Sequence, residues 1–217
     1  MKKIVLIALF IMLPTVVMAE SAPFDAPRWS LELKGGEFIP DIPNWSSYYG
    51  GRSTGQYGGA VAYKIIRQVE AGVEASHIRD AGQGYAPIHG VFAGHVAYDL
   101  VPVNAFVLLR GVFSEQQWIV PYVGGGWTRM YYKIAEEGQA TSRGFADGSH
   151  MRAGIQFLLD VLDPGAANNM SMYYGIQHSY FFLEAERTRA MVDSATIPAQ
   201  SINLGGTSWF YGILLEF

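Results

Sequence analysis

Charged side chains recur at every second position within short apolar runs of this chain, and they are the residues best suited to act together. Glu32 and Lys34 alternate with leucines in the run L-E-L-K, and Glu70 and Glu74 share one face of a later run. An arginine can hold a carboxylate through two parallel hydrogen bonds, and charges removed from water need such partners. We therefore expect a buried network of paired polar side chains. Its predicted members are Glu32, Lys34, Glu70, Glu74, Arg110, Arg152 and Gln156.

Within this network Arg152 follows from the clearest alternation in the chain. Met151, Ile155 and Phe157 alternate with Arg152 and Gln156, which is the period-two pattern of a strand with one apolar face. Arg152 therefore points away from the apolar side. The predicted carboxylate partners of Arg152 are Glu32, Glu70 and Glu74.

The histidines do not form a ligand spacing for a metal. His89 and His95 fall at an even separation on one predicted face, but His77 and His150 complete no group with them. A metal site needs three or four ligands in close spacing. The sequence predicts no metal and no cofactor.

The C-terminal run, T-S-W-F-Y-G-I-L-L-E-F over residues 207–217, shows which elements position these charges. One face of this run is wholly apolar and has aromatic residues at both ends, while Glu216 lies on the other face. Aromatic rings at both ends of an apolar stripe are typical of a strand that crosses a membrane. The residues of this stripe are Trp209, Tyr211, Ile213, Leu215 and Phe217.

The N-terminus predicts export. Lys2 and Lys3 precede an apolar run over 4–17 that is broken by Pro14, and the small residue Ala19 follows it. This is the pattern of a secretory signal peptide, and the run is shorter than the roughly 20 residues that a membrane-spanning helix needs. We predict a signal peptide over 1–19, a short lead over 20–27, and one domain over 28–217. The formal net charge of −4 gives no indication of nucleic-acid binding.

Apart from the predicted signal peptide, the chain contains no segment that is apolar enough to cross a membrane as a helix. A membrane offers backbone N–H and C=O groups no water to bind, so strands can cross only as a closed barrel. The composition agrees with this, because 14% of residues are aromatic, 16% are charged, and 25 are glycine. Cysteine is absent, so the hydrogen bonds between strands must close the structure.

Eight antiparallel strands fit this scheme, since both ends of the chain should lie on the same side and the strand count must then be even. The loops predicted on the opposite side are long, and 88–97 is the alternative position for an additional stretch of strand. The expected strands begin near residues 29, 57, 69, 98, 121, 149, 171 and 207. The expected long loops cover 39–56, 79–97, 134–148 and 185–204, and turn residues cluster at 163–169.

Two motifs resemble those of known bacterial proteins. The run P-Y-V-G-G-G over 121–126 is similar to a strand opening in OmpW-like outer-membrane barrels, and a terminal Phe after alternating apolar residues resembles the signal that their assembly machinery recognises. The whole chain looks like a small barrel related in pattern to OmpW and the OmpA transmembrane domain. This resemblance implies an outer-membrane location. The partners it implies are outer-membrane lipids and lipopolysaccharide, the assembly machinery and periplasmic chaperones.

The interior of an eight-stranded barrel is about wide enough for side chains to fill it. We therefore expect a structural or surface-interaction protein with no catalytic activity, its charged residues paired inside. The alternative is a narrow pore for small or hydrophobic solutes, as the OmpW resemblance implies.

A second alternative is an outer-membrane enzyme, since lipid A deacylases use a His and a Ser on one barrel strand. The pair available here is His178-Ser179. Adjacent residues on a strand point to opposite faces, whereas a nucleophile and its base must come within hydrogen-bond reach. The sequence therefore predicts no catalytic residue.

Overall fold

Antiparallel strands form almost all of the ordered structure in the computed structural model of the chain. The structure describes residues 27–42, 45–46, 51–86, 91–114, 117–138, 140–193 and 201–217. The strands are β1 (Trp29–Pro40), β2 (Thr54–Ile66), β3 (Val69–Ala86), β4 (Val91–Arg110), β5 (Ile119–Glu136), β6 (Ser142–Leu158), β7 (His178–Asp193), β8 (Ser201–Asn203) and β9 (Gly206–Glu216), and one helix, α3, covers Pro164–Tyr174.

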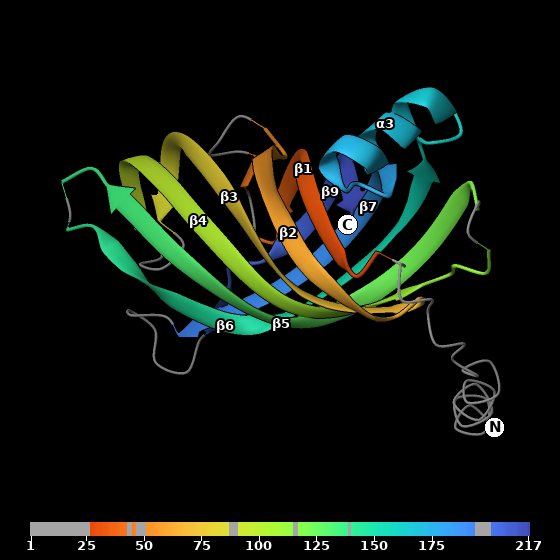
Figure 1. Ribbon diagram of the computed structural model, residues 1–217. Coiled ribbons are helices and arrows are strands. Elements are labelled where there is room, and N and C mark those ends of the chain that lie inside the picture. Colours follow the sequence, from red (N-terminus) through yellow and green to blue (C-terminus); the bar gives the residue numbers. More distant parts are fainter. Residues whose placement is uncertain are drawn as a thin grey trace, which may run out of the picture.

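Each strand from β1 to β7 pairs with the next, and β9 closes the sheet between β7 and β1. β1 pairs with β2 on one side and with β9 on the other, and β7 pairs with both β6 and β9. Figure 1 shows the tilted strands wrapping around a common interior, with β1 beside β2. β8 pairs with β7 in the same register as β9 does, so the two stretches act as one strand. Between them the pairing is interrupted, because the Asn203 side chain accepts a hydrogen bond from the Ala190 N–H (3.0 Å). The expected closed eight-stranded antiparallel barrel is confirmed.

Both ends of the described chain lie at the same end of the barrel. The Phe217 N–H donates to the Trp29 carbonyl (2.9 Å), and the Arg28 N–H donates to the Phe217 carbonyl (2.7 Å). The turn at 67–68 and the segment that carries α3 lie at this end as well. We call it the terminal end and the other the distal end.

A belt of outward-facing apolar side chains surrounds the barrel at its terminal half. On β4 the outward residues stay uncharged from Val101 to Leu109, and on β5 from Ile119 to Trp127. These stretches match the roughly 9–11 residues that a tilted transmembrane strand needs. Exposed members of this apolar belt include Trp29, Leu33, Val61, Ile65, Val73, Val103, Val107, Val123, Met151, Ile155, Leu183, Tyr211 and Ile213.

Beyond the belt the barrel wall continues toward the distal end, and we call this part the extension. β3, β4, β5 and β6 are 17 to 20 residues long, well over the length that the belt requires. In the extension the outward residues become charged, as at Asp99, Lys133 and Arg143, while the inward residues become apolar. The sidedness of the strands therefore reverses along their length.

Three predicted loops were wrong, because the barrel wall continues through them as strand. The range 79–97 was expected to be a loop so that the strand count stayed even, 134–148 because it is polar and charged, and 185–204 as the final loop before the C-terminal strand. Instead, β3 runs to Ala86 and β4 begins at Val91, β6 begins at Ser142, and β7 runs to Asp193. The alternative of a strand over 88–97 is correct for residues 91–97, and 87–90 lie outside the described residues. Part of the 39–56 loop is strand too, since β2 begins at Thr54.

The prediction that a strand begins near residue 171 was also wrong, because 164–174 form α3 and β7 starts at His178. Asp163 caps the helix by accepting from the Ala166 N–H (2.9 Å), and Pro164 lies in its first turn. Such residues mark helix starts as well as turns. The described residues contain no helix that is long and apolar enough to span a membrane. The predicted signal peptide lies outside the described residues.

Candidate functional site in the barrel lumen

The seven predicted polar residues all lie on inward faces of the barrel. Their exposed fractions are between 1% and 5%, so each is removed from solvent. They come from β1, β3, β4 and β6 and meet in the lumen, which is the interior of the barrel. The network has two main levels, centred on Arg152 and on Arg110.

Arg152 on β6 holds three carboxylates at once. Its Nη2 donates to Glu32 Oε2 (2.7 Å), its Nη1 to Glu74 Oε2 (3.1 Å) and its Nε to Glu184 Oε2 (2.5 Å). The guanidinium also lies over the ring of Phe106, 4.8 Å from its centroid. One side chain thereby links β6 to β1, β3 and β7. Two of the three predicted partners are correct, whereas Glu70 is not a partner of Arg152.

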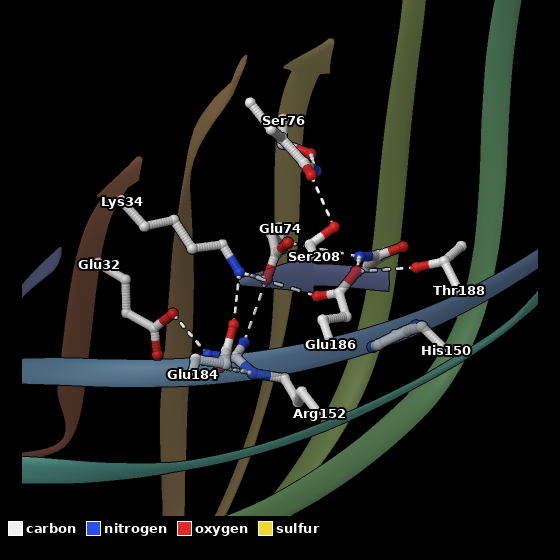
Figure 2. Close-up of polar contacts among 12 residues, drawn as sticks. Glu32, Lys34, Glu74, Ser76, His150, Arg152, Glu184, Glu186, Thr188 and Ser208 are labelled. Atoms are coloured by element: carbon white, nitrogen blue, oxygen red, sulfur yellow. Dashed lines mark hydrogen bonds and ion pairs between the residues drawn. The ribbon is translucent and has the colours of Figure 1, made fainter. Parts of the chain in front are cut away.

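Lys34 on β1 binds the same carboxylates from another side of the lumen. Its ammonium lies 2.7 Å from Glu74 Oε2, 2.9 Å from Glu184 Oε1 and 3.8 Å from Glu186 Oε2. Figure 2 shows Lys34 and Arg152 reaching toward these carboxylates from separate strands. Oxygens of Glu74, Glu184 and Glu186 lie within 4.8 Å of one another, as in a metal site. The Lys34 ammonium already supplies a cation to this group.

Arg110 on β4 organises a second level, nearer the terminal end. Its Nη1 lies 2.5 Å from both Glu70 Oε1 and Glu216 Oε1, and its Nη2 donates to Gln156 Oε1 (2.6 Å). Lys64 Nζ also contacts Glu216 Oε1 at 2.6 Å. Two cations and two carboxylates therefore balance at this level.

The Arg152 level carries an acidic excess. Lys34 and Arg152 face four carboxylates, which belong to Glu32, Glu74, Glu184 and Glu186. Glu186 Oε1 accepts from Thr188 Oγ1 (2.9 Å), but Glu186 Oε2 has no hydrogen-bond partner among the described residues. Pairing at this level is therefore complete around Arg152 and incomplete at Glu186.

Neutral polar side chains fill the space between the charges and the distal end. Thr128 donates to Asn104 Oδ1 (2.7 Å) and contacts His150 Nδ1 (3.0 Å). Farther on, Gln56 Nε2 donates to Ser76 Oγ (2.8 Å), and Gln56 Oε1 accepts from Ser208 Oγ (2.7 Å). These bonds link β4, β5 and β6 on one part of the wall, and β2, β3 and β9 on another, without any charge.

Sequence reasoning missed several members of the network. Glu184 and Glu186 alternate with Leu183 and Ala185, so the same period-two rule could have found Glu184 within the predicted seventh strand, and Glu186 if that strand had been extended past residue 184. Glu216 was placed opposite the C-terminal apolar stripe but not assigned a role. Asn104 and Tyr122 are also members, and Tyr122 donates to Glu184 Oε2 (2.8 Å).

The glycines of the P-Y-V-G-G-G run let the strands approach closely. Gly124 lies directly across from Arg152 in the β5–β6 register. A Cβ at Gly124 would lie 2.6 Å from the Val107 carbonyl oxygen, and one at Gly126 would collide with the Ala105 carbonyl. Glycine at these positions therefore avoids a clash with the backbone of the neighbouring strand β4.

Above the polar levels, toward the distal end, the lumen is filled with hydrocarbon. Val96, Met130 and Ile134 are completely buried there. This apolar plug consists of Phe38, Trp45, Ile78, Val96, Tyr98, Leu100, Met130, Tyr132, Ile134, Ala146, Ala190 and Leu204.

His178 and Ser179 both bind Asp160 rather than each other. His178 Nδ1 lies 2.8 Å from Asp160 Oδ2, and Ser179 Oγ donates to Asp160 Oδ1 (2.9 Å). The Ser179 N–H donates to the same oxygen (3.0 Å). This arrangement fastens the segment after β6 to the start of β7. The His178 ring does not contact the Ser179 hydroxyl, because its Nδ1 is directed to the other oxygen of Asp160.

The C-terminal stripe lies on the outside of the barrel. Trp209 and Tyr211 are each 59% exposed, Ile213 is 40% exposed, and Phe217 is 38% exposed. Leu215 lies between them on the same face and is partly exposed. The stripe therefore belongs to the apolar belt, and Phe217 marks its edge at the terminal end.

No protein-family model matches this chain, and no curated protein matches it in sequence. Solved structures do resemble it. The outer membrane protein OprG from Pseudomonas aeruginosa superposes with a TM-score of 0.58 at 11% identity, covering 88% of this chain and 96% of that one. Neisserial surface protein A (NspA) gives a TM-score of 0.56 at 9% identity, covering 87% of this chain and 97% of that one. At such identities the likeness concerns the fold. The chain has the fold of the small eight-stranded outer-membrane β-barrels, which together with its apolar belt supports a location in the bacterial outer membrane.

Proposed function

We propose that this chain is an outer-membrane barrel that conducts no solute, has no catalytic activity, and serves a structural or surface-interaction role. The observation that supports this proposal is the filling of the lumen. At the level of Arg152, side chains from β1, β3, β4, β5, β6 and β7 meet in direct contact. Passage of a solute would require several buried ion pairs to break together.

The apolar plug adds a second barrier. A hydrated ion that passed the charged levels would next meet Val96, Met130 and Ile134, which offer no polar group to replace its water. A hydrophobic solute would pass the plug more easily but would have to displace the ion pairs of Arg152 and Lys34. The narrow pore for small or hydrophobic solutes therefore ranks second.

The extension supports a surface-interaction role. A strand of 20 residues such as β4 is about 66 Å long at roughly 3.3 Å per residue, whereas the apolar band of such a barrel is about 25 Å tall. Even when tilted, β3 to β6 carry their outward polar faces beyond the membrane. A rigid sheet raised in this way presents a fixed surface to partners outside the cell.

Basic residues near the distal ends of β5 and β6 support lipopolysaccharide as a lipid partner. Lys133 on β5 lies directly across from Arg143 on β6, and both side chains are exposed and point outward. Like charges directly opposite each other destabilise a sheet. Among the described residues neither has a carboxylate within 4.0 Å. We propose that phosphate groups of lipopolysaccharide bind between them, and that Lys133→Gln with Arg143→Gln weakens binding to lipopolysaccharide vesicles at low salt.

Single-channel recording tests the main proposal. Purified protein reconstituted in a planar bilayer is expected to give no discrete current steps, with insertion checked by the mobility difference between boiled and unboiled samples on a gel. Reproducible steps whose size changes in Arg152→Lys would show that ions pass through the charged level. The pore hypothesis would then replace this proposal.

A further inference from the structure

The helix α3 is fixed by its own ends but packs against very little. At its start Asp163 accepts from the Ala166 N–H, and at its end Gly175 adopts a left-handed conformation (φ 72°) and donates to the Ser171 carbonyl (3.1 Å). None of its residues is buried. The local sequence therefore specifies a helix for which the barrel supplies no core.

Capping alone does not account for such a helix. Isolated helices shorter than about 12–15 residues are marginal in water, and most helical stability in proteins comes from packing one apolar face. α3 has 11 residues, and Gly165 and Asn168 are poor helix formers. A further surface is needed to stabilise it.

The helix has a face that suits an apolar surface. With 3.6 residues per turn, five residues fall within an arc of about 120°, and the polar residues Asn168 and Ser171 lie outside it. Tyr173 and Tyr174 on this arc are each 74% exposed. Ala167 and Met170 are intermediate in exposure. The arc consists of Ala166, Ala167, Met170, Tyr173 and Tyr174.

The position of α3 brings this face to the edge of the apolar belt. Phe157 near the end of β6 and Phe181 near the start of β7 stack on the outside of the barrel, with ring centroids 6.5 Å apart. Leu162, just before the helix, is 79% exposed. Figure 1 shows α3 at the terminal end, beside the C-terminus. The exposed arc therefore continues a surface that already contacts lipid.

The charge pattern agrees with a lipid interface. From residue 161 to residue 177 the only charged side chain is Asp163, which is used as the helix cap. Tyrosine favours the headgroup level of a membrane, where its ring is in an apolar layer and its hydroxyl is in water. Helices with one apolar face lie in this layer, parallel to the membrane surface.

We infer that α3 is an interfacial helix that lies in the phospholipid headgroup layer of the inner leaflet, with Tyr173 and Tyr174 directed into it. It anchors the terminal end of the barrel to the leaflet beside β7. This role depends on the membrane location of the barrel and is independent of whether the lumen conducts.

The absence of cysteine from the chain allows a direct test with single spin labels. Tyr173→Cys and Tyr174→Cys place a label on the arc, and Asn168→Cys is the matched control on the opposite side of the same helix. Val107→Cys gives a reference within the belt. Each labelled protein is reconstituted in phospholipid bilayers, and collision of the label with oxygen and with a water-soluble nickel chelate is measured.

We expect labels at 173 and 174 to be several-fold less accessible to nickel than the label at 168, and to approach the label at 107 in their preference for oxygen. Equal nickel accessibility at 168, 173 and 174 would show that the helix stands in water and would overturn the inference. Protection of 173 and 174 that appears only as protein is concentrated in the bilayer would show that a second copy covers the face, and would overturn it as well. Two arc positions are used so that a poorly folding variant does not decide the result.

Discussion

The interior of the barrel differs between the belt and the extension, although the same strands form both. Within the belt the lumen holds ion pairs and the outside is apolar, whereas in the extension the inside is apolar and the outside is charged. β5 shows the change within a few residues. Thr128 faces inward and Trp127 outward at the belt, while Ile134 faces inward and Lys133 outward in the extension.

The medium outside the wall explains this reversal. In the extension water surrounds the barrel, so burying Ile134 and Met130 inside removes apolar surface from water and stabilises the fold. Within the belt the outside is lipid, so placing an apolar side chain inside gains little over leaving it outside. Hydrogen bonds and ion pairs must specify the interior there, because unsatisfied polar groups cost most in lipid surroundings. The two halves are therefore held together by different forces.

The largest effect is expected at the centre of the charged half. Arg152→Met removes one guanidinium from three carboxylates, leaving Glu32, Glu74 and Glu184 with one ammonium between them. Breaking a buried pair on one side costs about 3–5 kcal/mol. Unfolding by guanidinium in lipid vesicles measures this loss. Arg143→Met, on the same strand but outward in the extension, is the matched control and should change stability by less than about 0.5 kcal/mol. An equal loss of stability in both variants would show that buried ion pairs do not stabilise the belt more than surface charges stabilise the extension.

A charge introduced on the outside tests the other side of the wall. Ile155 points outward within the belt and is 42% exposed, so Ile155→Arg should cost roughly 2–4 kcal/mol if it lies near the bilayer midplane. Met191 also points outward and is 38% exposed, but it lies in the extension across from Asp147. Met191→Arg should therefore be nearly neutral in the same unfolding assay. Tolerance of Ile155→Arg would place that part of β6 outside the membrane.

The reversal also sets the limit of what the sequence could predict. The count of eight strands followed from the requirement for an even number. The seven network residues followed from alternation with an apolar outward face, and this rule holds wherever lipid lies outside. It fails at Asp99, Lys133 and Arg143, because water lies outside there and the same alternation changes sign. Glu186 was missed because it fell in the predicted loop over 185–204, whereas β7 runs on to Asp193.

Pairing within the network could not be predicted from the sequence. Glu70 and Glu74 share one inward face, yet Glu70 pairs with Arg110 and Glu74 with Arg152 and Lys34. Which carboxylate meets which cation depends on the tilt and register of strands that are far apart in the chain. Alternation predicts whether a side chain points inward or outward. It does not predict how far along the barrel axis that side chain lies, and so does not predict its partner.

A smaller change in stability is expected from removing one methylene group, and its size should differ between the extension and the belt. Ile134 is completely buried in the apolar plug, so Ile134→Val should cost about 0.5–1.5 kcal/mol through the loss of one methylene. Ile155→Val removes the same group from the lipid-facing side, where acyl chains refill the space, and should be close to neutral. Paired unfolding measurements decide this. If Ile134→Val were as silent as Ile155→Val, the plug would be loosely packed and would offer less of a barrier to solutes.

The smallest effect on stability is expected at the edge of the belt, where the same residue should have a large effect on assembly. Phe217→Ala keeps the backbone bonds to Arg28 and Trp29 and removes a ring that is 38% exposed, so the finished barrel should lose less than about 1 kcal/mol.

We propose that the assembly machinery recognises this terminal aromatic residue, and that Phe217→Ala and deletion of Phe217 both lower the folded fraction in the outer membrane. Trp209→Ala, at the other end of the same stripe, is the control and should leave that fraction unchanged. Boiled and unboiled samples of outer-membrane and periplasmic fractions measure both quantities. Normal assembly of Phe217→Ala and of the deletion would show that the terminal residue only completes the belt, and that the two ends of the stripe are equivalent.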